Sequence, residues 1–206
     1  MSAKAKVLTI VAMFFMTATV LAACTPKAEL PLLGEAADFA LINQDNLEVR
    51  LSDFRGKVVV MNFTYTTCPD ECGVLSHKLK AARDGLEEGR KQDFVIISVS
   101  FDPEVDTPEV LKQYAFEQGF DVPGWQFLTG AQDQIRQVSD NYGATYELVE
   151  DSHPDEAPDE HDHRFSHNFV TIVIDQDGEV RKTYGHNFFT VTELRDAITS
   201  LLEVKT

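Results

Sequence analysis

Two short, almost continuous apolar runs constrain the fold of this chain more than any other feature. Val58–Phe63 and Phe94–Ser100 are hydrophobic at nearly every position, which is typical of strands buried on both faces. Between them, a segment from about Pro69 has apolar residues at helical spacing: Cys72, Leu75, Leu79, Ala82 and Leu86, with Gly89 beyond its end. This strand–helix–strand order predicts an α/β sheet with helices on both faces.

Strand and helix signals alternate along the rest of the chain. An N-terminal hairpin is predicted from Phe39–Ile42 and Leu47–Leu51, and a closing hairpin from Phe169–Ile174 and Val180–Tyr184 around an Asp-Gly turn. Further elements are predicted as a helix from Thr107, a short strand Trp125–Leu128, a helix ending at Gly143, an edge strand Ala144–Val149 and a helix opened by the capping box Thr190…Glu193. The closing hairpin makes the sheet mixed, and the order is thioredoxin-like.

The first residues indicate export. Lys4 and Lys6 precede the apolar stretch 7–23, which ends in Leu-Ala-Ala before Cys24 and has the form of a secretory signal peptide. A transmembrane anchor is the alternative, because the stretch is at the short limit of a bilayer span. Leu-Ala-Ala-Cys also resembles the lipobox of bacterial lipoproteins, which implies that Cys24 is lipidated. We expect a signal peptide (1–23), a flexible tether (24–37) and one domain (38–206), held by its lipid at a membrane in the periplasm or elsewhere outside the cytoplasm.

Charge and cysteine content exclude two classes of protein. Acids outnumber bases 34 to 18, which gives a net charge of −16 and excludes a general affinity for nucleic acid. Three cysteines are too few for a disulfide-stapled scaffold.

Part of the acidic excess lies in one segment, 151–163, which has no apolar periodicity and is predicted to be a solvated loop. Its histidines, His153, His161 and His163, allow a second interpretation, a weak secondary site for copper or zinc.

Cys68 and Cys72 form the most informative motif. They follow directly on the strand Val58–Phe63, at the start of a predicted helix, and residues four apart share a helix face. Both sulfurs are therefore expected at one point outside the carboxyl edge of the sheet, where α/β folds place ligands. A structural disulfide would constrain little of the unfolded chain, because the loop is short. Two functional interpretations remain, thiol–disulfide exchange and binding of a soft metal.

His167 favours the metal. It precedes Phe169–Ile174, across the predicted sheet from the cysteines, at a position that carries a cis-proline in redox thioredoxins. Two thiolates and one imidazole suit Cu(I), whereas zinc, the competing metal, usually takes four ligands. His77 and His186 have no ligand-like context and are expected to be ordinary residues.

These residues resemble the SCO/SenC family of copper-binding proteins, which assist cytochrome c oxidase assembly. The resemblance covers about 38–202 and depends on Thr-Thr-Cys-Pro-Asp-Glu-Cys at 66–72, the Asp-Pro…Asp-Thr-Pro stretch at 102–108, and His167. Ser166 is a departure, since family members often have Asp before this histidine. The resemblance implies a thioredoxin-like domain in which Cys68, Cys72 and His167 bind copper. It also implies that Asp102 and Asp106 lie near the metal, although they could equally cap the turn into the next helix.

The leading hypothesis is a copper metallochaperone that carries Cu(I) or Cu(II) and whose cysteines form a reversible disulfide. By resemblance, its partner is cytochrome c oxidase subunit II or another copper protein, with other periplasmic copper chaperones as further partners. The alternative is a thiol–disulfide oxidoreductase that keeps the oxidase copper-site cysteines reduced, and whether the protein is an enzyme stays open. A peroxiredoxin-type peroxidase ranks last, because Cys-x-x-x-Cys does not resemble its motif.

Overall fold

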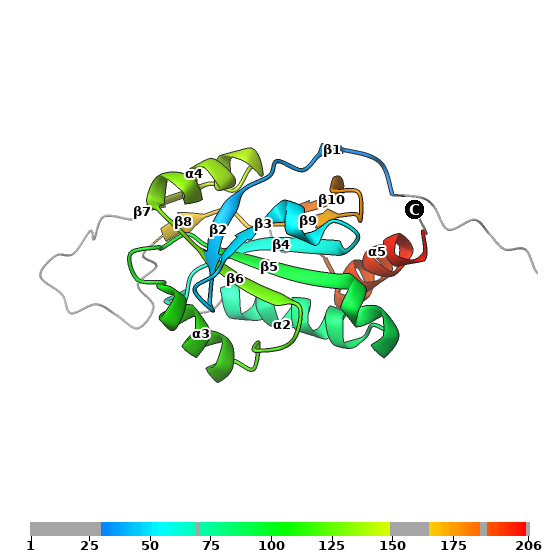
Figure 1. Cartoon of the computed structure of the whole chain (residues 1–206), viewed down its shortest axis with the longest axis horizontal. Coiled ribbons are helices and arrows are strands. Elements are labelled where there is room, and N and C mark those ends of the chain that lie inside the picture. The colour runs from blue at the N-terminus through cyan, green and yellow to red at the C-terminus, as the bar shows by residue number, and fades with distance from the viewer. Residues whose placement is uncertain (1–29, 69–70, 149–164, 186–188, 205–206) are drawn as a thin grey trace, which may run out of the picture.

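The computed structural model describes residues 30–68, 71–148, 165–185 and 189–204. The strands are β1 (Gly34–Glu35), β2 (Ala40–Asn43), β3 (Glu48–Arg50), β4 (Val58–Thr64), β5 (Phe94–Ser100), β6 (Trp125–Thr129), β7 (Tyr146–Leu148), β8 (Phe165–His167), β9 (Val170–Ile174) and β10 (Glu179–Gly185). The helices are α2 (Glu71–Asp84), α3 (Pro108–Glu117), α4 (Gln132–Asn141) and α5 (Val191–Glu203), with short 3-10 turns η1 (Leu51–Phe54) and η2 (Glu88–Asp93) (Figure 1).

A mixed sheet of eight strands forms the centre of the molecule, in the order β1-β10-β9-β4-β5-β6-β2-β3. The neighbours β4, β5 and β6 run parallel, and the hairpins β2–β3 and β9–β10 are antiparallel. Every residue of β4 and β5 is buried, as their apolar runs predict. The α/β class, the mixed sheet and both predicted hairpins are therefore confirmed.

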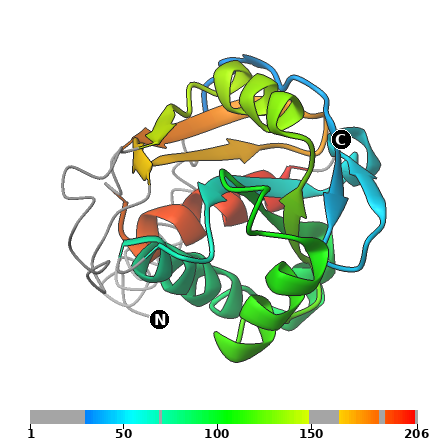
Figure 2. The ribbon, with the colours of Figure 1, turned by 90° about the vertical axis from the view of Figure 1, so that its left-hand side faces the viewer.

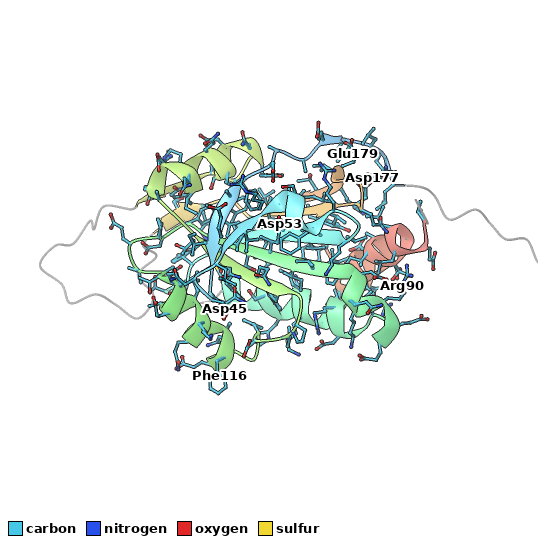
Figure 3. All side chains as sticks on the ribbon, in the orientation of Figure 1. Asp45, Asp53, Arg90, Phe116, Asp177 and Glu179 are labelled. Atoms are coloured by element: carbon cyan, nitrogen blue, oxygen red, sulfur yellow. A yellow bond between two sulfur atoms is a disulfide. The ribbon has the colours of Figure 1, made fainter. Side chains whose placement is uncertain are left out.

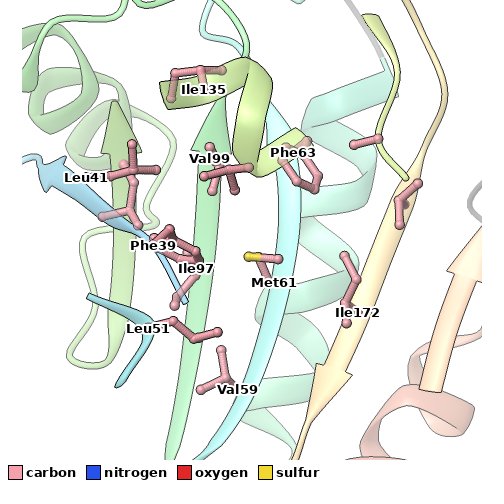
Figure 4. Close-up of a cluster of buried hydrophobic side chains, with 14 of the residues drawn as sticks. Phe39, Leu41, Leu51, Val59, Met61, Phe63, Ile97, Val99, Ile135 and Ile172 are labelled. Carbon is pink, nitrogen blue, oxygen red and sulfur yellow. The ribbon is translucent and has the colours of Figure 1, made fainter. Parts of the chain in front are cut away.

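Alternate residues of β4 face two different hydrophobic clusters. Val59, Met61 and Phe63 belong to a cluster that includes Ile135 of α4 (Figure 4). Val58 and Val60 belong to the other cluster, which is covered by apolar residues of α2, α3 and α5: Leu75, Leu79, Leu111, Leu194 and Ile198. Helices consequently cover both faces of the sheet, with α4 on one side and the other three on the opposite side (Figure 1).

Three expectations differ from the structure. The stretch Ala144–Val149 does not add an edge strand to the central sheet, because β7 pairs with β8 in a separate two-stranded ribbon (Figure 2). The helix after the cysteines ends at Asp84, so Leu86, expected on its apolar face, lies beyond it, and Gly89 lies beyond the helix as expected. Gly34 and Glu35, assigned to the tether, pair with β10, so the ordered domain begins before residue 38.

Several predicted features lie outside the described residues. These are the signal peptide 1–23, Cys24 and the tether up to residue 29, the loop 151–163 with His153, His161 and His163, and His186. Among the residues described, no helix combines the length and apolar composition that crossing a bilayer requires.

Candidate metal centre

The two cysteines lie where β4 leads into α2. Cys68 is half-buried in the connecting loop, and its backbone N–H donates to the carbonyl oxygen of Tyr65 at 3.3 Å. Cys72 belongs to the first turn of α2 and is only 2% exposed. A disulfide joins the two sulfurs, with the Cα atoms 6.0 Å apart. The i,i+4 spacing therefore brings both sulfurs to one point, beside the end of β4.

His167 is the last residue of β8, a strand that the sequence did not predict. Its ring packs against three aromatic rings, with centroid distances of 5.7 Å to Tyr65, 5.6 Å to Phe101 and 4.6 Å to Phe169. The Nδ1 atom lies 3.2 Å from the carbonyl oxygen of Asn168. These contacts hold the imidazole in one orientation, with one of its ring nitrogens near the cysteine sulfurs.

The three side chains meet at one place. One sulfur each from Cys68 and Cys72 and one ring nitrogen of His167 all lie within 4.8 Å of one another. In the part of the chain that the structure describes, this is the one group of three or more His, Cys, Asp or Glu side chains so arranged. The strand end, the helix start and β8 thus bring together three candidate ligands from distant parts of the sequence.

Asn168 fixes the segment that carries His167. Its backbone N–H donates to the carbonyl of Thr145 at 3.0 Å, its Oδ1 accepts from the N–H of Thr145 at 2.8 Å, and its Nδ2 donates to the carbonyl of Gly143 at 2.9 Å. The end of β8 is therefore held against the turn between α4 and β7. Sequence reasoning missed this residue, although an Asn directly after the candidate ligand is a weak signal for such a backbone clamp.

An aromatic layer beneath the site was also missed. Phe101 stacks on Phe63 at 5.3 Å and packs at a tilt against Tyr146 at 4.5 Å, and both Tyr65 and Phe101 are fully buried. Burial raises the pKa of Tyr146, an effect opposed by the nearby positive charge of Arg136. Tyr65 and Phe101 lie just beyond the predicted strands Val58–Phe63 and Phe94–Ser100, and only the folded chain shows that they pack with Phe169 around one histidine.

Asp102 and Asp106 are buried but neither is part of the Cys–Cys–His group. Thr107 is the N-cap of α3, as the sequence predicts, because its Oγ1 accepts the N–H of Val110. Asp106 instead accepts hydrogen bonds from Thr66 and Ser100. His77 is exposed on α2 and packs edge-on against Phe120 at 5.0 Å, away from the cysteines.

The chain matches a family model over residues 31–203, and the description of that family is SCO1/SenC. The chain belongs to the SCO1/SenC family. It is 31% identical over 173 residues to the mitochondrial SCO1 homolog 1 of Arabidopsis thaliana, which corresponds to 82% of this chain and 48% of that protein. It therefore spans about half the length of this relative.

Solved structures of the family share the fold. Arabidopsis thaliana ScoI with copper bound has a TM-score of 0.68 at 29% identity, covering 81% of this chain and 97% of that one. A SCO1/SenC family lipoprotein from Bacillus anthracis has a TM-score of 0.70 at 27% identity, covering 85% and 100%. BsSco, described as a cytochrome c oxidase assembly protein with a disulfide switch, has a TM-score of 0.67 at 25% identity, covering 86% and 100%. The thioredoxin-like fold that the sequence predicts is confirmed.

Proposed function

We propose that this protein is a copper metallochaperone that holds one Cu(I) between Cys68, Cys72 and His167 and assists assembly of the copper site of cytochrome c oxidase. One observation carries the proposal: two sulfurs and one imidazole nitrogen lie within 4.8 Å of one another. Membership of the SCO1/SenC family and the likeness to a copper-bound ScoI support it.

The donor set suits a soft ion. Thiolate and imidazole ligands bind metals at about 2.0–2.3 Å, which places three ligands around one ion about 4 Å apart, so the group can surround one ion after the disulfide is reduced and its sulfurs move apart. Cu(I) accepts few, soft ligands, whereas zinc usually takes four. No fourth thiol, imidazole or carboxylate from the described chain joins the group. The same ligands could hold Cu(II) after addition of a further ligand.

The disulfide controls access of the metal. Only thiolates bind copper, so the Cys68–Cys72 bond must first accept two electrons and two protons from a dithiol reductant. Oxidation of the same pair would release copper or prevent its binding. The disulfide switch described for BsSco supports this use of the pair.

We expect one tightly bound Cu(I) per reduced chain. Substitution His167→Ala should lower the Cu(I) affinity at least about 100-fold, since even the outer partners of metal ligands are worth about 10–100-fold. The measurement is a titration of the reduced, copper-loaded protein with a competing Cu(I) chelator. His77→Ala is the matched control, because that ring packs on Phe120 and should leave the affinity unchanged.

The alternative function is a thiol–disulfide oxidoreductase that keeps the oxidase copper-site cysteines reduced. The half-buried Cys68 beside the fully buried Cys72 favours it, because one sulfur is accessible for exchange and the other can resolve the mixed disulfide. A reduced protein that retains no copper in the chelator titration, yet reduces a disulfide in a peptide with two cysteines, would support this function and contradict the chaperone.

We also propose that the domain works outside the cytoplasm, tethered to a membrane through lipidated Cys24. The lipobox and the likeness to a Bacillus anthracis SCO1/SenC lipoprotein support this location. The proposed partners are oxidase subunit II or another copper protein, and other copper chaperones of the same compartment.

A further inference from the structure

A fully buried carboxylate lies beside the loop that carries Cys68. Asp106 is 0% exposed, and its Oδ2 accepts the backbone N–H of Thr66 at 3.1 Å. Oδ1 also accepts the hydroxyl of Thr66, and Oδ2 the hydroxyl of Ser100, which is itself buried. One side chain therefore binds both the loop after β4 and the last residue of β5.

The position of Thr66 makes this contact important. It stands two residues before Cys68, inside the turn after β4 in which the carbonyl of Tyr65 accepts the N–H of Cys68. The end of β4 is fixed by its pairing of Thr64 with Ser100. Beyond that pair, Asp106 links Thr66 to Ser100 at the end of β5 through its hydrogen bonds. Cys68 comes two residues after Thr66.

Asp106 is itself held rigidly. Its backbone N–H and that of Val105 both donate to the carbonyl of Asp102, at 2.8 and 3.1 Å, in a turn that leads directly into α3. The Asp102 N–H donates to the Ser100 hydroxyl at 3.0 Å, so the turn is also joined to β5. The charge of Asp106 is felt nearby, because burial first and this carboxylate second raise the pKa of Tyr114.

We infer that Asp106 is a positioning residue for the cysteine pair: through Thr66 it holds Cys68 at the place where its sulfur meets that of Cys72. The inference depends on the redox-active dithiol of the proposed function but not on copper. Loss of the carboxylate should lower the effective concentration of one thiol at the other. The disulfide should then be easier to reduce, even in a protein that remains folded.

The test measures the equilibrium between disulfide and dithiol in the full chain at fixed ratios of reduced and oxidised dithiothreitol. In this reaction the Cys68–Cys72 bond breaks, each sulfur gains a proton, and dithiothreitol is oxidised to its cyclic disulfide. After alkylation, mass spectrometry of the peptide containing Cys68 and Cys72 gives the ratio, so Cys24 does not contribute. This test contains no copper. If the wild type fails to bind copper in the separate chelator titration, that result therefore contradicts the proposed function and leaves the positioning role of Asp106 untouched.

We expect Asp106→Ala to shift the equilibrium about tenfold toward the dithiol, the size of one lost hydrogen bond to a charged group. Asp106→Asn should stay within about threefold of the wild type, because an amide oxygen in the place of Oδ2 still accepts from the Thr66 N–H and the Ser100 hydroxyl, and the Thr66 hydroxyl can rotate to accept from the amide NH2. Thr66→Val removes only the hydroxyl donor. It should shift the equilibrium in the same direction, and have no further effect when combined with Asp106→Ala.

Asp175→Asn is the matched control. Asp175 is also a buried carboxylate that accepts backbone N–H groups in a turn, those of Asp177 and Glu179, but it lies at the β9–β10 hairpin. Urea unfolding of each variant gives its loss of stability. The positioning role is wrong if Asp106→Ala moves the equilibrium no more than Asp175→Asn does. It is also wrong if Asp106→Asn shifts the equilibrium as far as Asp106→Ala. If Asp106→Ala does not fold, Thr66→Val and Asp106→Asn decide by the same criteria.

Discussion

At the scale of single residues, the rings packed around His167 fix the orientation of this proposed ligand. Phe169 packs edge-on against the imidazole at 4.6 Å, and Tyr65 and Phe101 close two further sides. A ligand whose orientation is fixed before the ion arrives loses less conformational entropy when it binds. The aromatic contacts therefore contribute to affinity without touching the metal.

We predict that Phe169→Leu lowers Cu(I) affinity about 2- to 10-fold, because an aromatic pair of this kind is worth about 0.5–1.5 kcal/mol. The stoichiometry should stay at one copper per chain, since all three proposed ligands remain. The chelator titration described for His167→Ala measures both quantities. Phe116→Leu is the control, because this ring is 69% exposed on α3 and points into solvent (Figure 3). Equal affinities in the two variants would show that the ring does not orient the histidine.

Sequence reasoning found the sulfurs more directly than any other part of the site. Cys68 and Cys72 were predictable because i,i+4 spacing at a helix start is a local rule, independent of the rest of the fold. His167 needed a topology as well, and the resemblance to SCO/SenC supplied the expectation that it is a ligand. The role of Asp106 was not predictable, since its partners Thr66 and Ser100 come from two other segments that only the folded sheet brings together.

At the scale of elements, α5 depends on a reciprocal cap at its first turn. The Thr190 N–H donates to Glu193 Oε2 at 2.7 Å, and the Glu193 N–H donates to Thr190 Oγ1 at 3.1 Å. These hydrogen bonds, first from the backbone and then from the side chain of Thr190, lower the pKa of Glu193. Because the pKa is lower in the folded state, the stabilisation is complete above the unfolded pKa of about 4.5 and is lost as the pH falls through the folded value.

We therefore predict that Glu193→Gln lowers the free energy of unfolding at pH 7, and that its difference from the wild type shrinks as the pH falls below about 4. Urea unfolding at pH 7 and pH 3 measures both differences. The control is Glu203→Gln at the other end of α5, where a negative charge opposes the helix dipole and its removal should not destabilise the protein. A difference that stays constant with pH would contradict the assignment to the carboxylate.

The central elements were predictable because their signals are local. Continuous apolar runs specified β4 and β5, and the capping box specified the start of α5. The pairing of β7 with β8 was not predictable, because each strand has three residues and the two strands are far apart in the sequence. Short strands carry little periodicity, and the expected edge strand therefore paired with the segment of His167 and not with the central sheet.

At the scale of the whole molecule, the acidic excess is a property of the surface and not of the fold. Asp45, Asp53 and Asp177 are exposed on turns and a short 3-10 segment, and the partly exposed Glu179 begins β10 (Figure 3). A net charge of −16 favours approach to a basic partner and raises the rate of encounter at low salt, while leaving the packed core unaffected.

The proposed lipid on Cys24 limits where this surface can act. The ordered domain is already hydrogen-bonded at Leu33, whose N–H donates to the carbonyl of Val180 at 2.8 Å. Eight residues lie between Cys24 and Leu33, and the nine steps from one Cα to the next span about 30 Å at most in a fully extended chain. We predict that the mature protein begins at an acylated Cys24, stays with the membrane fraction, and holds its domain within this distance of the bilayer.

Intact-mass measurement and fractionation of cells that produce the full chain test this prediction. Cys24→Ser should remove the added acyl mass and release the protein from the membrane lipid, or leave it unprocessed with residues 1–23 attached. Copper affinity of the purified variant should be unchanged, because the proposed ligands are Cys68, Cys72 and His167. Cys68→Ser is the converse control and should keep the acyl mass while losing copper. An unmodified Cys24 in the mature wild-type protein would contradict the lipid anchor and leave the metal centre unaffected.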